Sequence, residues 1–250
     1  NGFLENPASV NEITLPAQME EISKGAFQGC TSLRKVVLSE HLTKIGIGAF
    51  QDCTALQTMV LPDSVTELGE DAFLGCTSLQ KLVLSKNLKC IPQRAFYQCT
   101  SLNEIVIPSG VERIESQAFV QCSSLYALSL PETVSYVGQN NFNGDTALLS
   151  LTVYNPDCHL MTSDYELPKQ VLLYCYQDSS LYWYAQQYGR EYVLLDTPET
   201  TTPSVTTAPP ETTATSPVTS TAAVSTATES VTAAQTTTTT ATTAETTAQT

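Results

Sequence analysis

Apolar residues recur along the chain at a constant spacing of 23 residues. Six units of this length follow one another without insertion, and their first residues are Ile13, Val36, Met59, Leu82, Ile105 and Leu128. A second apolar column consists of Phe27, Phe50, Phe73, Phe96, Phe119 and Phe142. A fixed period of this size predicts a solenoid, in which each unit is one coil and the columns join into a continuous apolar core.

Side chains alternate between inward and outward positions in the segment 33–38, with Val36 and Leu38 directed inward. A period of two residues predicts a short β-strand. We expect these strands to stack in parallel as one sheet on the concave face of the solenoid. Loops or short helical turns are expected opposite the sheet.

The repeats also predict how the chain is divided. The expected parts are a partial repeat (2–12), six full repeats (13–150) and a C-terminal cap (151–195), together one solenoid domain (1–195), followed by a linker (196–250). The partial repeat is inferred because Gly2 and Val10 precede Gly25 and Leu33 by one period. An uncapped coil would expose apolar surface and free strand edges, so we expect further modules upstream.

The predicted cap reads as strand, helix and strand over residues 171–195. Ser179 or Ser180 is suited to begin the helix and Gly189 to end it. One face of this helix carries Leu181, Tyr184, Ala185 and Tyr188. We expect this apolar face to close the end of the core.

The linker has a composition that cannot form a core. From Thr197 to Thr250 there are 24 threonines and five prolines, with no aromatic residue, Lys, Arg or Gly. Burial of so little apolar surface cannot offset the ordering entropy, so we expect this segment to stay extended. Threonine-rich stretches with proline are typical of stalks and linkers in exported proteins, which predicts an anchoring or docking module downstream.

The chain is acidic, with a formal net charge of −14, about −9 of it before the linker. An acidic surface without a Lys or Arg cluster repels phosphate groups, so nucleic acid and anionic membrane surfaces are not expected as partners. No window has the long uncharged apolar run of a membrane-spanning helix. Membrane insertion is therefore not expected.

The repeat sequence is distinctive enough to compare with known families. The stretch from Leu61 to Leu84 reads LPDSVTELGEDAFLGCTSLQKLVL. It resembles the BspA-like class of leucine-rich repeats, found in bacterial and protozoan surface proteins. The resemblance implies a leucine-rich-repeat solenoid that is secreted or attached to the cell surface and serves adhesion or protein binding. The sixth unit departs from the pattern, with Asn141 and Asp145 where the pattern has Ala and Cys.

Five of the eight cysteines recur at one repeat position, and they are Cys30, Cys53, Cys76, Cys99 and Cys122. Neighbouring coils lie about one strand spacing apart, so distance alone permits bridging, but parallel side-chain directions disfavour it. We expect a ladder of buried structural thiols. Cys158 and Cys175 lie in the irregular cap and are the best disulfide candidates, although the sequence leaves their pairing undecided. Cys90 is expected to be a half-exposed lone thiol.

No pattern in the sequence combines a nucleophile with a base. The two histidines are His41, in a turn of the second repeat, and His159, in the cap. The adjacent Cys158 and His159 are not a thiol-protease signature, because such pairs meet through the fold and not by adjacency. Without a CxxC or HxxxH pair, or a Gly-rich phosphate loop, neither a metal nor a cofactor is expected.

Two surfaces are candidates for binding. The outward strand column is Val37, Val60, Val83 and Val106, flanked by Thr14 and Ser129. It would form an apolar stripe on the concave sheet, unless these β-branched residues merely suit strands. In the cap, Tyr182 and Trp183 fall off the inward face of the helix. They could present a ring to a sugar or a peptide, or they could help to close the core.

These observations leave two hypotheses for function. The first is a non-catalytic extracellular adhesion or scaffolding module that recognises a host, bacterial or matrix protein through the concave sheet. The second is an accessory domain of a larger secreted enzyme that contacts carbohydrate through the aromatic cap. The linker composition resembles that which often precedes dockerin modules in gut and rumen bacteria, which fits the second hypothesis.

Overall fold

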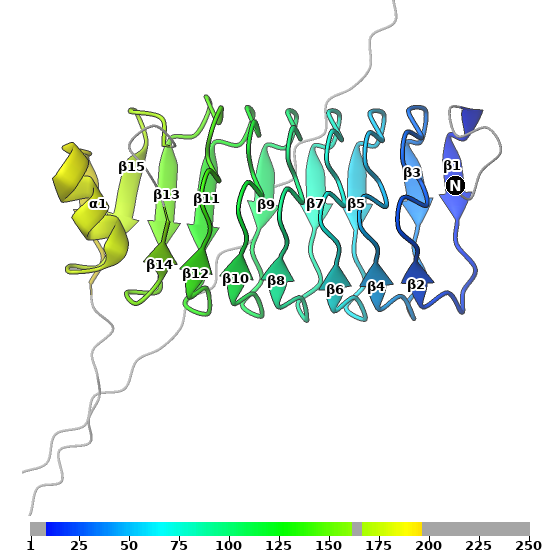
Figure 1. Cartoon of the computed structure of the whole chain (residues 1–250), viewed down its shortest axis with the longest axis horizontal. Helices are drawn as coiled ribbons and strands as arrows, with labels where there is room; N and C mark the ends of the chain where they lie inside the picture. Colours follow the sequence, from blue (N-terminus) through cyan, green and yellow to red (C-terminus); the bar gives the residue numbers. More distant parts are fainter. Residues whose placement is uncertain (1–8, 162–166, 197–250) are drawn as a thin grey trace, which may run out of the picture. The chain divides into compact units, whose positions relative to one another are not determined.

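The computed structural model describes residues 9–161 and 167–196, which form one solenoid of stacked coils (Figure 1). The first residues of the expected partial repeat and the threonine-rich linker from residue 197 lie outside the described residues. In the view of Figure 1, the coils follow one another in sequence order from the N-terminal end to α1.

Two rows of strands run along the solenoid. The longer strands are β1 (Glu12–Thr14), β3 (Lys35–Val37), β5 (Thr58–Val60), β7 (Lys81–Val83), β9 (Glu104–Val106), β11 (Ala127–Leu130), β13 (Ser150–Val153), β15 (Leu172–Cys175) and β16 (Tyr192–Leu194). The two-residue strands are β2 (Glu21–Ile22), β4 (Lys44–Ile45), β6 (Glu67–Leu68), β8 (Cys90–Ile91), β10 (Arg113–Ile114), β12 (Tyr136–Val137) and β14 (His159–Leu160). We call the outward surfaces of the two rows the long-strand face and the short-strand face.

The strand pairs of the described residues are parallel, and those from β1 to β14 keep the register of the repeat. In the cap the register changes, since Ser150 pairs with Leu172 and Leu173 with Tyr192. Leu82 of β7 lies beside Met59 of β5 and Ile105 of β9, so the first residues of the units are neighbours in space. Hydrogen bonds group the longer strands as β1-β3, β5-β7-β9 and β11-β13-β15-β16, and the short strands as β2-β4-β6 and β8-β10-β12-β14. The predicted parallel stacking is confirmed.

The side opposite the longer strands contains a second row of strands, where the sequence predicted loops or short helical turns. The turns that follow the short strands also bond from coil to coil. The N–H of Gly25 donates to the carbonyl of Ile47 at 2.9 Å, and the N–H of Phe27 donates to the carbonyl of Ala49 at 2.8 Å. The N–H groups between them bond three residues back within the same coil, as Ala26 does to Ser23. These segments are therefore runs of turns, and α1 (Ser180–Tyr188) is the only α-helix among the described residues.

Close backbone contact between coils explains the glycine that follows the inward residue of several short strands. A Cβ on Gly69 would lie 2.4 Å from the backbone nitrogen of Ile47, and one on Gly46 would lie 2.6 Å from that of Lys24. At both positions a Cβ would collide with the backbone of the neighbouring coil, and glycine permits this close approach.

The core is a continuous column of aromatic and aliphatic side chains. The rings of Phe27 and Phe50 lie 5.2 Å apart between centroids, those of Phe50 and Phe73 5.4 Å apart, and those of Phe73 and Phe96 6.1 Å apart. All six phenylalanines of the repeat column are buried. From Phe27 to Phe119, each ring therefore contacts the ring of the next coil, as the sequence columns predicted.

The cysteine ladder lies beside the phenylalanine column. The Sγ of Cys53 donates to the carbonyl of Phe27 at 3.2 Å, one coil earlier. The same contact recurs in the next coils from Cys76, Cys99 and Cys122, at 3.1, 3.2 and 3.3 Å. Burial raises the pKa of these thiols, that of Cys53 to about 12. The predicted ladder is therefore a row of buried, uncharged thiols that hydrogen-bond the turn backbone.

The sixth unit ends this regular stacking with two buried polar side chains. Asn141 Oδ1 accepts from the N–H of Ala118 at 2.8 Å, and its Nδ2 donates to the carbonyl of Gly138 at 2.8 Å. Asp145 Oδ1 accepts from the N–H of Cys122 at 2.8 Å. The two departures from the repeat pattern thus satisfy backbone groups where the coil-to-coil pattern changes.

The cap forms as predicted. Ser179 is the N-cap of α1, and its hydroxyl oxygen accepts from the N–H of Tyr182 at 3.2 Å. Gly189 ends the helix in the left-handed conformation, at φ 60°. Leu181, Tyr184 and Ala185 are the buried residues of the helix. The strand β16 then pairs with β15 as the last strand of the long row.

Candidate functional site

The four valines of the expected stripe lie in one row on the long-strand face. Val83 of β7 is in register with Val60 of β5 and with Val106 of β9. The exposed fractions of Val37, Val60, Val83 and Val106 are 44%, 63%, 41% and 70%. Thr14 lies beside Val37 at one end of the row, as expected. Ser129, the other expected flank, is paired in register with Thr152 of β13. The structure therefore brings together the residues of the first candidate surface.

Charged side chains lie on both sides of the valine row. On one side, two or three residues before a valine, are Arg34, Lys35, Lys81 and Glu104. On the other side, three residues after a valine, are Glu40, Asp63 and Lys86. All of them are exposed, and the ion pair of Lys35 with Glu12 is long, at 4.0 Å. The valine row is therefore an apolar strip between two polar borders.

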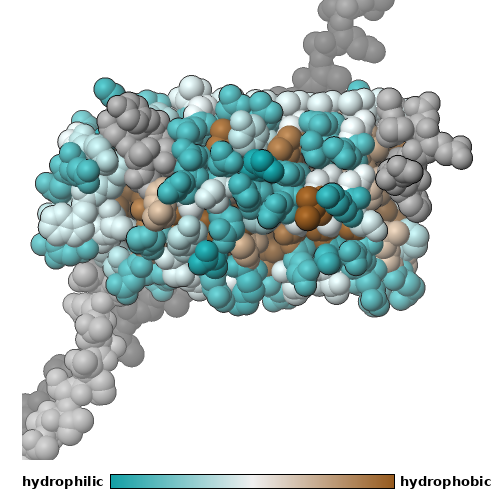
Figure 2. Space-filling model, viewed as in Figure 1, coloured by the Kyte–Doolittle hydropathy of each residue, from teal (hydrophilic) through white to brown (hydrophobic). Residues whose placement is uncertain are grey.

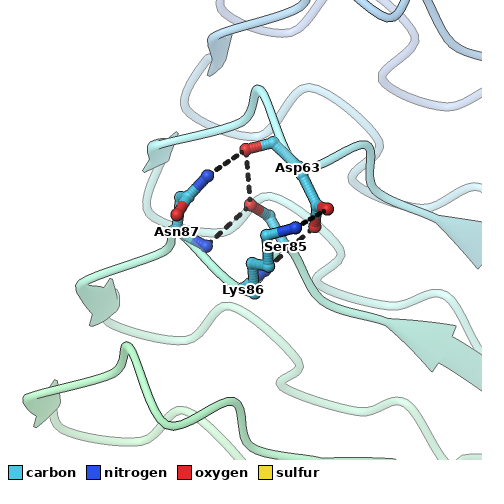
Figure 3. A network of polar contacts seen from close by, with 4 residues as sticks. All are labelled: Asp63, Ser85, Lys86 and Asn87. Carbon is cyan, nitrogen blue, oxygen red and sulfur yellow. Dashed lines mark hydrogen bonds and ion pairs between the residues drawn. The ribbon is translucent and has the colours of Figure 1, made fainter.

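Figure 3 shows the border formed by Asp63, which follows β5, and by Ser85, Lys86 and Asn87, which follow β7 in the next coil. Asp63 pairs with Lys86, and its backbone carbonyl accepts from Asn87 Nδ2 at 2.8 Å and from Ser85 Oγ at 3.3 Å. The hydrogen bond from Lys86 lowers the pKa of the Asp63 carboxyl. This carboxylate is thus already partnered by a cation of the next coil.

The long-strand face is hollowed between neighbouring strands. One hollow lies between β3 and β5 beside Val37 and Val60, and another lies between β7 and β9 beside Val83 and Val106. A third, of about 350 Å³, lies between β9 and β11 beside Val106. The valines therefore border shallow grooves that side chains of a partner can enter.

Sequence reasoning missed three exposed apolar residues on the same face. Tyr126, Leu149 and Tyr154 are exposed by 52%, 58% and 42%, and both tyrosines line the third hollow. A signal was present, because Tyr126 and Leu149 occupy an outward column that holds only polar residues in earlier units. These earlier residues are Arg34, Gln57, Gln80 and Asn103.

The short-strand face has a different character, because its outward side chains pair with one another. Lys44 lies 3.7 Å from Glu21 and 3.8 Å from Glu67. The guanidinium of Arg113 lies 4.2 Å from the ring centroid of Tyr136. The ring of Tyr136 stacks in turn on that of His159. This face offers a partner few unpaired groups, which favours the long-strand face as the binding surface.

The space-filling view in Figure 2 shows one side of the molecule. Hydrophobic residues form separate patches there within a mostly hydrophilic surface. Most of the large hydrophobic side chains that are exposed belong to the long-strand face, and they are Val37, Val60, Val83, Val106, Tyr126, Leu149, Tyr154 and Val193.

All eight cysteines are free thiols. Cys158 lies beside the short-strand β14 and Cys175 ends the long strand β15, so the disulfide considered from the sequence is not formed in the structure. Burial raises the pKa of Cys158 to about 11, which keeps it protonated at neutral pH beside His159. Cys90 is half-buried, and burial and Glu115 raise its pKa.

Metal ligands are not clustered in the part of the chain that the structure describes. No group of three or more His, Cys, Asp or Glu side chains there is arranged to hold a metal ion. The two histidines lie apart from one another, since His159 stacks on Tyr136 and His41 lies beside Ser39 in the second repeat. Across residues 9–161 and 167–196, no helix is long and apolar enough to cross a bilayer.

The aromatic cap presents one ring to solvent. Trp183 is exposed by 57%, whereas Tyr182 is partly buried against the core. Tyr182 contacts Trp183 and Tyr192 edge to face, with centroids 5.2 and 5.6 Å away. Gln186 Nε2 donates to the hydroxyl of Tyr192 at 2.7 Å. Tyr182 therefore supports the cluster, and Trp183 is the ring that a ligand could reach.

Parallel coils of 23 residues around a leucine-rich core define this fold as a leucine-rich-repeat solenoid. Within that class, the chain belongs to the BspA-type leucine-rich-repeat family. The sequence profile described as BspA type Leucine rich repeat region matches residues 1–124 and 49–161, with six copies. The family resemblance stated from the sequence is confirmed. A search of curated proteins found no match.

Several solved bacterial structures are similar. A leucine-rich repeat protein from Bacteroides ovatus ATCC 8483 is 22% identical, with 75% of this chain and 61% of that chain covered and a TM-score of 0.43. The T. pallidum Leucine Rich Repeat protein is 23% identical, with coverages of 73% and 85% and a TM-score of 0.42. A leucine rich cell surface protein from Faecalibacterium prausnitzii A2-165 is 17% identical, with coverages of 76% and 80% and a TM-score of 0.42. The chain spans less than two thirds of the Bacteroides ovatus protein.

Proposed function

We propose that this chain is a non-catalytic binding module of an extracellular bacterial protein, and that it recognises a protein partner through the long-strand face. The observation that carries the proposal is the row of four exposed valines between two charged borders, of which Val60, Val83 and Val106 are paired in register. Apolar surface rimmed by polar residues is characteristic of protein interaction sites. The side chains of the short-strand face pair with one another and leave a partner few unpaired groups, which also supports the long-strand face as the site.

We propose a non-catalytic module for two reasons, which are the family to which the chain belongs and the raised pKa of its buried thiols. Leucine-rich-repeat families are generally non-catalytic. A nucleophilic cysteine requires a thiolate, whereas burial raises the pKa of Cys158 and of the ladder cysteines. The extracellular location rests on the family and on the composition of the sequence after residue 196.

The test is binding of the full chain to an array of extracellular-matrix and bacterial surface proteins, before and after the double substitution Val60→Glu and Val83→Glu. Burying an unpaired carboxylate in an interface is costly, so we expect binding to fall at least tenfold. Both valines are exposed, so the free energy of unfolding should change by less than about 1 kcal/mol. Thr66→Glu, which adds a carboxylate next to β6, is the matched control and should bind normally. Undiminished binding by the double variant would refute the site.

Trp183 favours a second candidate function, an accessory domain that contacts carbohydrate through the cap. An exposed indole that stands against a second ring is a suitable platform for the apolar face of a sugar. A glycan array should then register binding that Trp183→Ala removes. Tyr126→Ala, which deletes an exposed ring on the long-strand face, is the control and should leave glycan binding intact.

A further inference from the structure

The valine row has a spacing that selects one kind of partner segment. Neighbouring parallel strands lie about 4.8 Å apart, so Val37 and Val106 are separated by three such steps, about 14 Å. An α-helix advances about 5.4 Å per turn, so three turns cover about 16 Å. A helix laid along the row would therefore place one apolar side chain near each valine, with an accumulated mismatch of about 2 Å.

An extended segment fits the row less well. Its side chains on one face repeat every 6.4–6.8 Å or so, which exceeds the step between coils by roughly 2 Å each time. The mismatch grows to about 5–6 Å over the three steps from Val37 to Val106. Backbone pairing cannot compensate, because the valines lie on the face of the sheet and strand addition requires an edge.

The charges beside the valine row indicate which flank of a bound helix should be acidic and which should be basic. On the side that precedes the valines, Arg34 and Lys81 are exposed cations without an ion-pair partner among the described residues, and Lys35 has only its long contact with Glu12. On the opposite side, Glu40 is an exposed carboxylate without a cationic partner in the described part of the chain. Glu104 is the exception on the basic side. Two borders of opposite sign fit a partner with one acidic and one basic flank.

We propose that the long-strand face binds an amphipathic α-helix of a partner protein, with its axis along the valine row. Its apolar stripe packs on Val37 to Val106, its acidic flank faces Arg34 and Lys81, and its basic flank faces Glu40. This inference rests on the proposed function and names the class of its partner. The grooves beside the valines receive the side chains of the apolar stripe.

Two displayed peptide libraries test the proposal against the full chain. One library fixes apolar residues at helical spacing (i, i+4, i+7, i+11), the other fixes them at alternate positions, and both randomise the remaining positions. We expect the helical library to give binders enriched in Asp and Glu on one flank. Synthetic versions of these binders should lose at least tenfold in affinity for Val60→Glu. They should also weaken severalfold for Lys81→Glu, which changes an exposed charge and leaves the core intact.

The outcomes separate this inference from the proposed function. Binders from the alternating library that are lost with Val60→Glu would overturn the helical partner and leave the long-strand site standing. Helical binders that Lys81→Glu strengthens would overturn the assigned orientation of the flanks. If every binder from both libraries binds Val60→Glu as tightly as the original chain, or if neither library yields a binder, the site and its partner class both fall.

Discussion

The first five repeats and the sixth fold the same turn with different side chains. In the coils that carry Cys53 to Cys122, a thiol donates to the phenylalanine carbonyl of the preceding coil. In the sixth coil Asp145 stands at that position, and its Oδ2 is buried without a hydrogen-bond partner among the described residues. The repeating coils therefore place a weak neutral donor at this position, and the last coil places there a group that can ionise.

The exchange of cysteine for Asp145 shows what kind of side chain this repeat position requires. The site is dry and faces a backbone carbonyl, so it favours a small group that donates a hydrogen bond and carries no charge. A protonated carboxyl meets this requirement and an ionised one does not. Burial raises the pKa of Asp145 to about 8, so the protonated form predominates at neutral pH. The last coil therefore keeps a neutral side chain at the ladder position, and Asp145 Oδ1 accepts the N–H of Cys122 there.

The largest effect is expected from a break in the aromatic column of the regular repeats. Phe73→Ala removes a ring that is stacked on both sides, by Phe50 and Phe96. We expect a loss of about 3–5 kcal/mol in the free energy of unfolding, since the rigid stack leaves a cavity. Phe142→Ala, at the end of the column, should cost less. Denaturant titration followed by circular dichroism measures both, and equal losses would contradict the comparison.

A smaller effect of opposite sign is expected from Asp145→Asn. The amide keeps an acceptor for the N–H of Cys122 and supplies a neutral donor. We expect a gain on the order of 2–4 kcal/mol at pH 7, because the natural chain must hold a proton that the unfolded chain releases. Denaturant titration at pH 7 gives this difference directly.

The pH dependence of the same pair of proteins sharpens this prediction. The folded pKa of Asp145 is raised from 3.8 to about 8, so the folded state binds the proton more tightly than the unfolded state. Stability from this group is complete at low pH, falls as pH rises above 4, and stops falling above about pH 8. The advantage of Asp145→Asn should grow over that window. An advantage that is constant from pH 4 to pH 8 would show that Asp145 does not carry the proton.

The smallest effect is expected within the thiol ladder. Cys99→Ala removes the bond to the carbonyl of Phe73, which still accepts the N–H of Cys76. Because that carbonyl keeps one partner, the loss should be only about 0.5–1.5 kcal/mol. Cys99→Ser keeps a donor at the same position and should recover part of the loss. Parallel denaturant titrations test this order, and a serine variant less stable than the alanine variant would reverse it.

Much of the fold could be predicted because the repeat reports each inward position several times. The phenylalanine column and the inward residues of the longer strands were readable in this way. The capping roles of Ser179 and Gly189 were readable instead from the residue types that begin and end helices. The second row of strands could not be predicted. Each of its strands has two residues, which is too short for an alternating pattern to be distinguished from a turn.

The candidate site was only partly readable for a related reason. Repetition identifies columns, so the valine row was found, whereas Tyr126, Leu149 and Tyr154 are departures from columns and were missed. The pairing of Arg113 with Tyr136 also escaped, because it depends on two unlike columns meeting on neighbouring coils. Reading the sequence by repeated columns therefore overlooks residues that differ between repeats.

Burial prevents the ladder thiols from reacting in the folded chain, and the unfolded chain lacks this protection. Thiol exchange and oxidation require a thiolate, and the ladder keeps its sulfurs protonated and out of contact with solvent. Once the coils separate, the same cysteines return to ordinary acidity and can cross-link at random. In oxidising surroundings, loss of the stack therefore becomes irreversible, so the lifetime of the protein is set by how rarely its coils open.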